Sequence, residues 1–251
     1  MARQTGIIKL KGTIGDISFY KSKDGHLART KGGVDANRIA TDPAFQRTRE
    51  NGSEFGRAGK GGKVLRTAMR LLLQNASDKR VTSRLTKELV AVIKGDSTNE
   101  RGSRTIQDGS LSLLESFEFN NGGKLATLLF ASFTSTLDRV AGTVITDLPD
   151  FVASTSIIAP NGTTHFKINS GAAEIDFANE VSVFDSASSS ILPWNGDTVS
   201  ALSLTSTLTA NSTLPIFQVV GIEFFQEVNG QMYPLKNGSY NALSIVGVDI
   251  P

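Results

Sequence analysis

The sequence has no cysteine and only two histidines and one tryptophan among its 251 residues. The lack of cysteine excludes disulfides, cysteine-ligated zinc, iron–sulfur clusters and thiol catalysis. His26 and His165 are isolated from each other and from any pattern of further ligands, so neither predicts a metal site or a nucleophile–base pair. We therefore expect a protein that is not an enzyme, with no catalytic residue, cofactor, metal or small-molecule substrate.

Long apolar runs are missing as well. No stretch of about 18 apolar residues occurs, so we expect no membrane span. The first twelve residues alternate charged and apolar side chains and lack the apolar core of a signal peptide. These features predict synthesis in the cytoplasm, with the final location there or in an assembled particle or filament.

Charge is abundant but unevenly distributed. Residues 1–110 contain 22 Lys and Arg against 11 Asp and Glu, a net charge of +11, whereas residues 111–251 contain 4 against 13, a net charge of −9. Such a split indicates either a polyanionic ligand or contact between the basic part of one subunit and the acidic part of another.

The basic part predicts strands followed by helices. Short β-favouring runs fill the first thirty residues, and Lys23-Asp24-Gly25 predicts a tight hairpin turn. Thr41-Asp42-Pro43 predicts a helix start, with a helix to about Lys60 that buries Phe45 and Phe55 and ends at Gly61-Gly62. Gly52, Gly56 and Gly59 suggest close approach of another backbone. Apolar periodicity then predicts a helical hairpin over residues 64–73 and 81–93.

The acidic part predicts an antiparallel β-sandwich. Val-, Ile-, Phe- and Thr-rich segments alternate with Asn-Gly and Gly-Gly turn signals. The predicted strands cover residues 113–119, 125–133, 140–148, 163–168, 173–177, 181–184, 202–208, 216–227 and 242–248. A polar stretch over residues 95–109 reads as a linker. The expected fold is α+β, with an N-terminal β-hairpin and helical hairpin in domain 1–110 and the sandwich in domain 111–251.

One glycine-rich segment invites comparison with a phosphate-binding loop. Residues 56–63 combine four glycines with two lysines, but no Ser or Thr follows either lysine, and the preceding segment is predicted to be helical rather than a strand. Nucleotide binding is therefore not expected. The carboxylates of the acidic part fit the outward positions of alternating strands better than a paired catalytic site.

The cations of the predicted helices are the candidate functional residues. They can form a solvated face, a nucleic-acid-binding face or a subunit interface, and the acidic remainder of the chain favours the interface. Base stacking on this face would depend on Phe45 and Phe55, which we expect to be buried. The candidate residues are Arg47, Arg49, Arg57, Lys60, Lys63, Arg66, Arg70, Lys79, Arg80, Arg84 and Lys87.

The N-terminal hairpin offers a second means of association. A strand pair at a chain end can dock on its own domain or add to the open sheet edge of a neighbour. The sequence leaves both options open.

Two segments carry a resemblance to known sequences. Gly12-Thr-Ile-Gly-Asp-Ile-Ser-Phe-Tyr-Lys-Ser-Lys-Asp-Gly-His-Leu-Ala-Arg and Asp42-Pro-Ala-Phe-Gln-Arg-Thr-Arg-Glu-Asn-Gly-Ser-Glu-Phe-Gly resemble the opening of an uncharacterised family of Bacteroidota proteins of unknown function. The resemblance covers about the first hundred residues. It implies a bacterial or phage-associated setting and no activity.

These patterns together predict a structural protein whose copies assemble into a filament, tube or shell, that is, a homo-oligomer, with a virion-like particle among the options. The alternative is a nucleic-acid-binding protein that uses the same basic helices. A glycan-binding β-sandwich ranks last, because such sites need exposed aromatic side chains and Trp194 is the only tryptophan.

Overall fold

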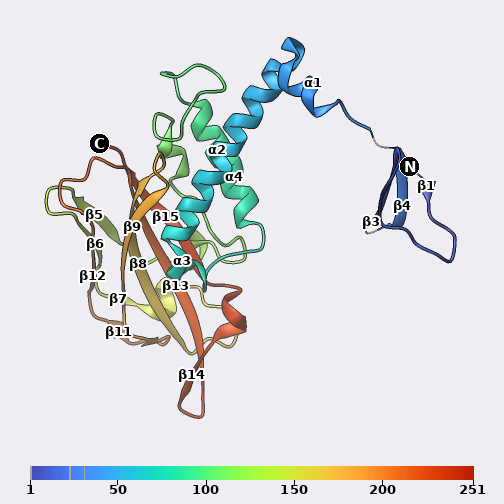
Figure 1. Cartoon of the computed structure of the whole chain (residues 1–251). Helices are drawn as coiled ribbons and strands as arrows, with labels where there is room; N and C mark the ends of the chain where they lie inside the picture. The colour runs from blue at the N-terminus through green and yellow to red at the C-terminus, as the bar shows by residue number, and fades with distance from the viewer. Residues whose placement is uncertain (1, 23, 31) are drawn as a thin grey trace. The chain divides into compact units, whose positions relative to one another are not determined.

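The computed structural model describes residues 2–22, 24–30 and 32–251 and contains two compact units, residues 1–49 and 50–251 (Figure 1). This division differs from the boundary expected after residue 110. The difference arises because the helices after residue 50 share a hydrophobic core with strands near the C-terminus, whereas we had assigned those helices and strands to separate domains.

The first unit is a small antiparallel sheet followed by short helices. Its strand order is β1-β4-β3-β2. The strands are β1 (Ala2–Arg3), β2 (Gly12–Ile14), β3 (Ile17–Ser22) and β4 (Gly25–Thr30), and the helices are α1 (Ala36–Thr41) and the 3-10 helix η1 (Pro43–Phe45). None of the described residues in this unit is buried.

The predicted N-terminal hairpin is confirmed, with a shift in register. Ser22 of β3 pairs with Gly25 of β4, and Lys23 of the predicted turn lies outside the described residues. We had placed Asp24-Gly25 at the centre of the turn. Gly25 instead begins β4 with a φ of +103°, a conformation that glycine adopts without strain.

The long helix α2 (Gln46–Ala68) continues through Gly61-Gly62, so the predicted end at Lys60 was wrong. The two glycines allow close packing. A Cβ atom on Gly61 would lie 2.1 Å from Ile106 Cδ1, and one on Gly62 would lie 3.3 Å from Leu89 Cδ1. Tertiary contacts therefore stabilise a helical conformation that glycine by itself disfavours.

The other glycines of α2 do not make the close contacts that we expected. A Cβ atom on Gly52, Gly56 or Gly59 would meet no heavy atom within 4 Å. Phe55 is also 63% exposed, which contradicts the predicted burial, while Phe45 is half-buried. The sequence pattern identified the helix correctly but assigned the wrong side of its N-terminal half to the interior.

The second helix of the predicted helical hairpin is confirmed, whereas the first, expected over residues 64–73, is divided between the end of α2 and a separate short helix. After α2, the short helix α3 (Arg70–Leu73) leads to α4 (Val81–Lys94), which buries Val81, Leu85, Leu89 and Ile93 at intervals of four residues. This spacing places the four side chains on one helical face. Figure 1 shows α2 and α4 side by side.

The remaining strands form the antiparallel sheets of the second unit. They are β5 (Thr134–Asp138), β6 (Thr143–Leu148), β7 (Phe151–Val152), β8 (His165–Asp176), β9 (Val181–Ser188), β10 (Leu192–Pro193), β11 (Thr198–Val199), β12 (Leu202–Thr207), β13 (Ile216–Val228), β14 (Gln231–Pro234) and β15 (Ala242–Asp249). Short helices lie between them or precede them: η2 (Leu111–Leu114), α5 (Leu125–Leu128), α6 (Ala153–Ser156) and η3 (Leu235–Gly238).

The central pair β8–β13 organises three layers. β8 pairs on its other side with β9 and β10, and β13 with β14 and β15. Alternation along β13 directs Phe217 and Val219 into the core shared with the helices, and Val220 and Ile222 into the core shared with the sheet β12-β6-β5. β12 also lies beside β9, so the sheets form a curled, sandwich-like arrangement. The predicted α+β class is confirmed.

Two predicted strands were wrong. The segment 125–133 begins with the helix α5, and the segment 113–119 begins in η2 and adds only a single bridge, between Glu118 and Ser244. Short apolar runs cannot be assigned to strand or helix by periodicity alone, and here their side chains reach the cores from helical turns and loops.

Candidate interaction surface

The eleven candidate cations separate into two groups by exposure. Arg49, Arg57, Arg66 and Arg84 are half-buried and donate hydrogen bonds to backbone carbonyl groups of their own unit. The other seven are exposed to solvent: Arg47, Lys60, Lys63, Arg70, Lys79, Arg80 and Lys87. The first group is thus engaged within the fold, while the second group is the more open to solvent.

Two of the half-buried arginines fasten loops. Arg49 donates to the carbonyl oxygens of Ile39, at 2.7 Å, and Asp42, at 3.0 Å, and so holds the turn that precedes α2. Arg57 donates to the carbonyl oxygens of Gly102, at 2.6 Å, and Arg104, at 2.8 Å. Arg57 donates through both terminal nitrogens of its guanidinium fork, whereas both hydrogen bonds of Arg49 come from Nη1, and each side chain stabilises the fold.

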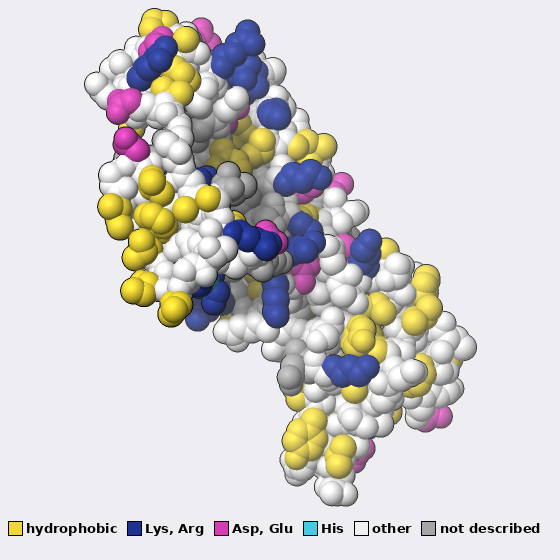
Figure 2. All heavy atoms as spheres, turned by 90° about the vertical axis from the view of Figure 1, so that its right-hand side faces the viewer, with side chains coloured by type: hydrophobic (Ala, Val, Ile, Leu, Met, Phe, Trp, Pro, Cys, Tyr) yellow, Lys and Arg dark blue, Asp and Glu magenta, His cyan; other side chains and the backbone are white. Residues whose placement is uncertain are grey.

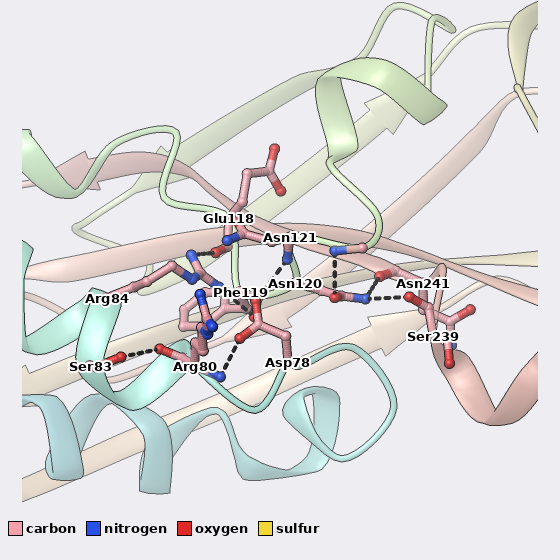
Figure 3. A network of polar contacts seen from close by, with 11 residues as sticks. Asp78, Arg80, Ser83, Arg84, Glu118, Phe119, Asn120, Asn121, Ser239 and Asn241 are labelled. Carbon is pink, nitrogen blue, oxygen red and sulfur yellow. Dashed lines mark hydrogen bonds and ion pairs between the residues drawn. The ribbon is translucent and has the colours of Figure 1, made fainter. Parts of the chain in front are cut away.

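Arg84 is the most heavily engaged cation of the set (Figure 3). Its guanidinium group donates to the carbonyl oxygens of Glu118, at 2.5 Å, and Phe119, at 3.0 Å, and to Asp78 Oδ2, at 2.6 Å. The guanidinium carbon also lies 5.1 Å from the centre of the Phe117 ring. Arg84 thereby ties α4 to the chain that enters the β-sheets.

Asp78 completes this network. Burial disfavours its charge, but hydrogen bonds from the amides of Asn121 and Arg80 and from the Arg84 guanidinium outweigh that effect and hold its pKa below the usual range. Asp78 is thus ionised and paired at neutral pH. The sequence assigned Arg84 to the cationic face because no local pattern reveals a partner that lies more than thirty residues away.

The exposed cations carry few acidic partners. Lys60 lies 3.4 Å from Glu180 and Lys87 lies 3.6 Å from Glu88, and the lysine of each pair is well exposed, so these contacts contribute little stability. No ion pair within the described residues involves Lys63, Arg70 or Lys79. On the face drawn in Figure 2, dark-blue Lys and Arg side chains are interspersed with yellow apolar ones.

A second exposed feature is the sheet of the first unit. Antiparallel pairing places Ile14 opposite Ile17, and Phe19 opposite Ala28, so these side chains share one face. Ile14 is 62% exposed and Ile17 is 45% exposed. The opposite face carries Tyr20 beneath the Arg29 guanidinium, 5.4 Å from the ring centre. The first face, on which Lys21 also lies, therefore leaves Ile14 and Ile17 exposed beside the half-buried Phe19 within the described part of its unit.

The two histidines lie in different units. His26 lies in β4 of the first unit and His165 in β8 of the second, where its Nε2 is 3.9 Å from Glu227 Oε2. Among residues 2–22, 24–30 and 32–251, no three His, Asp or Glu side chains gather in a way that could hold a metal ion. The helices of this same part include none that is long and apolar enough to cross a membrane.

Comparison of the chain with models of protein families, with curated proteins and with solved structures gave no match. The function is therefore inferred from the molecule itself.

Proposed function

We propose that this protein is a non-enzymatic structural protein whose copies assemble into a filament, tube or shell. The observation that carries this proposal is the apolar face of the first unit, on which Ile14 and Ile17 are exposed and Phe19 is half-buried. An isolated small sheet without a packed face is marginally stable in water, so this face needs a partner surface.

The net charges of the different parts of the chain indicate which surface covers the apolar face. Residues 1–49 contain 10 Lys and Arg against 4 Asp and Glu, a net charge of +6, whereas residues 111–251 carry −9. Two basic units repel each other, while a basic unit and an acidic β-sheet surface attract. The favoured contact joins the first unit of one copy to the acidic part of the next. Because the two surfaces differ, the contact is heterologous and propagates into a ring or an open filament.

Sedimentation velocity and negative-stain electron microscopy of the full chain test this proposal. We expect assemblies that grow with protein concentration and weaken as salt rises from about 0.05 M to 0.5 M, because salt screens the attraction between exposed charges. Ile17→Glu should reduce assembly, since it places a carboxylate on the apolar face. Val34→Glu is the matched control, because Val34 is 42% exposed but lies outside the sheet.

A monomer at every concentration and salt would refute the proposal. That result would mean that the apolar face docks within its own chain. Equal assembly of the Ile17→Glu and Val34→Glu proteins would show that the face is not the contact.

A further inference from the structure

A groove of about 790 Å³ runs along the exposed side of α4, with Phe55 of α2 as part of its wall. Lys79 precedes α4, and Lys87 and Lys94 follow at intervals of eight and seven residues. Within α4, Lys87 and Lys94 are seven residues, or about two turns, apart and therefore lie on one side of the helix, about 10 Å apart along its axis, while Lys79 lines the same groove from the segment before the helix. The cations therefore form a line along the groove.

Phe55 presents an unusually accessible ring. It is 63% exposed, and its neighbours on the same side of α2, at positions i−3 and i+4, are Gly52 and Gly59. In a helix those positions hold the side chains that would otherwise cover a ring. Because both are glycine, with open space around them, only Asn51 and the buried Ala58, at positions i−4 and i+3, remain as helical neighbours of the Phe55 ring, which stays largely exposed.

The rest of the groove is small and uncharged. Between the lysines lie Thr82, Thr86 and Val90, and the Thr86 hydroxyl already donates to the Thr82 carbonyl oxygen at 2.8 Å. The described residues that line the groove include no carboxylate. The groove thus combines three cations, an accessible aromatic ring and a shallow wall of methyl groups.

We propose that this groove binds single-stranded nucleic acid, with the lysines along the phosphates and an unpaired base stacked on Phe55. A positively charged groove with an aromatic platform is the combination that recognises single strands without sequence preference. A duplex keeps its bases stacked inside and would leave the ring unused. An acidic amphipathic helix needs a row of pockets for successive large anchors, and here only one large apolar side chain is present.

The site is separate from the proposed assembly contact. The groove belongs to residues 50–251, whereas the apolar sheet face belongs to residues 1–49, and they share no residue. The inference therefore does not depend on self-assembly, and each can fail alone.

The test uses the full chain and a fluorescein-labelled single-stranded oligothymidine of about 15 nucleotides, titrated by fluorescence anisotropy. With about three phosphates neutralised, the slope of log affinity against log salt should be about −2. Phe55→Leu should weaken binding about 5- to 150-fold, because leucine keeps an apolar surface but cannot stack. Phe55→Tyr should bind within about twofold of the native chain, since tyrosine also stacks.

Matched controls separate the groove from general effects. Leu71→Ala changes a side chain that is 66% exposed elsewhere, and it should leave the affinity unchanged. Lys87→Glu should make the salt dependence shallower, by about one unit of slope, whereas Lys236→Glu, outside the groove, should not. Circular dichroism should show the same thermal unfolding for all variants, because each changed side chain is exposed.

Three results would overturn the proposal. They are no saturable binding at about 50 mM salt, equal affinity of the native and Phe55→Leu proteins, and binding of an acidic leucine–glutamate peptide in place of the oligonucleotide. The Ile17→Glu protein should still bind the oligonucleotide, which distinguishes failure of the groove from failure of assembly.

Discussion

Arg84 provides the sharpest test of the structural account, because the sequence predicts it on an exposed cationic face, whereas the structure shows it half-buried in a hydrogen-bonded network. Only 23% of its side chain and 20% of the Asp78 side chain are exposed. Arg84→Met removes the charge and three hydrogen bonds while keeping an apolar stem beside Phe117. It leaves two carbonyl oxygens without this donor and a partly buried carboxylate without its cation.

The magnitude follows from these contacts. Removing one partner of a buried ion pair costs about 3 to 5 kcal/mol. Asp78 keeps its hydrogen bonds from the amides of Arg80 and Asn121, and a fifth of its side chain is solvated, so the lower end applies. We expect Arg84→Met to lower the free energy of unfolding by about 3 kcal/mol, and the melting temperature by roughly 6 to 12 °C for a unit of this size.

Urea unfolding followed by tryptophan fluorescence measures this effect, because Trp194 is the only tryptophan and lies in the second unit. The control is Arg80→Met, since the contacts of Arg80 in the network come from its backbone and its side chain is exposed. It should change stability by less than about 0.5 kcal/mol. A loss of less than about 1 kcal/mol for Arg84→Met, or equal losses in both variants, would refute the reasoning.

Four further predictions concern buried and exposed positions of the second unit. Gly59→Ala should raise the free energy of unfolding in urea by about 1 kcal/mol, because helix propensity improves in open space. Gly61→Ala should lower it, because the new Cβ atom would meet Ile106 at 2.1 Å. Glu223 is 6% exposed and accepts hydrogen bonds from two asparagine side chains. Glu223→Ala should lower the free energy of unfolding in urea by about 2 to 3 kcal/mol. Burial disfavours the charge of Asp96, but four hydrogen bonds to its carboxylate outweigh that effect and hold its pKa well below the usual range. The free energy of unfolding should therefore fall as the pH drops below about 4, where the carboxylate of the unfolded chain becomes protonated. In Asp96→Asn this decrease at acidic pH should be smaller, as measured by thermal unfolding followed by circular dichroism.

Local sequence patterns predicted much of the fold. The periodicity of residues 81–93 identified α4, and the turn signals located the hairpin of β3 and β4 to within one residue. Both are features of short sequence range, in which the residues that determine the structure are adjacent or one turn apart. The length of α2 was not predictable in this way, because Gly61-Gly62 is helical only through contacts with Ile106 and Leu89.

The sequence shows which residues are cationic, but it does not show which of their side chains are exposed. Of the eleven candidate cations, four are half-buried and donate hydrogen bonds to backbone carbonyl groups, which no local sequence pattern indicated. Lys94, which lines the α4 groove, was not among the candidates, and Phe55 was assigned to the interior. Helical periodicity shows that two sides of a helix differ, but a glycine-rich stretch gives too few apolar side chains to tell which side is buried.

The sequence by itself determined the absence of cysteine chemistry, the opposed charges of the two parts and the α+β class, since these depend on composition and on patterns a few residues long. The tertiary structure alone decided which cations remain free, because Arg57 and Arg84 find their partners between 34 and 47 residues away. It also decided that Phe55 faces solvent beside a line of lysines. Contacts between distant segments bury one charge and expose another of the same kind, and no local pattern contains that information.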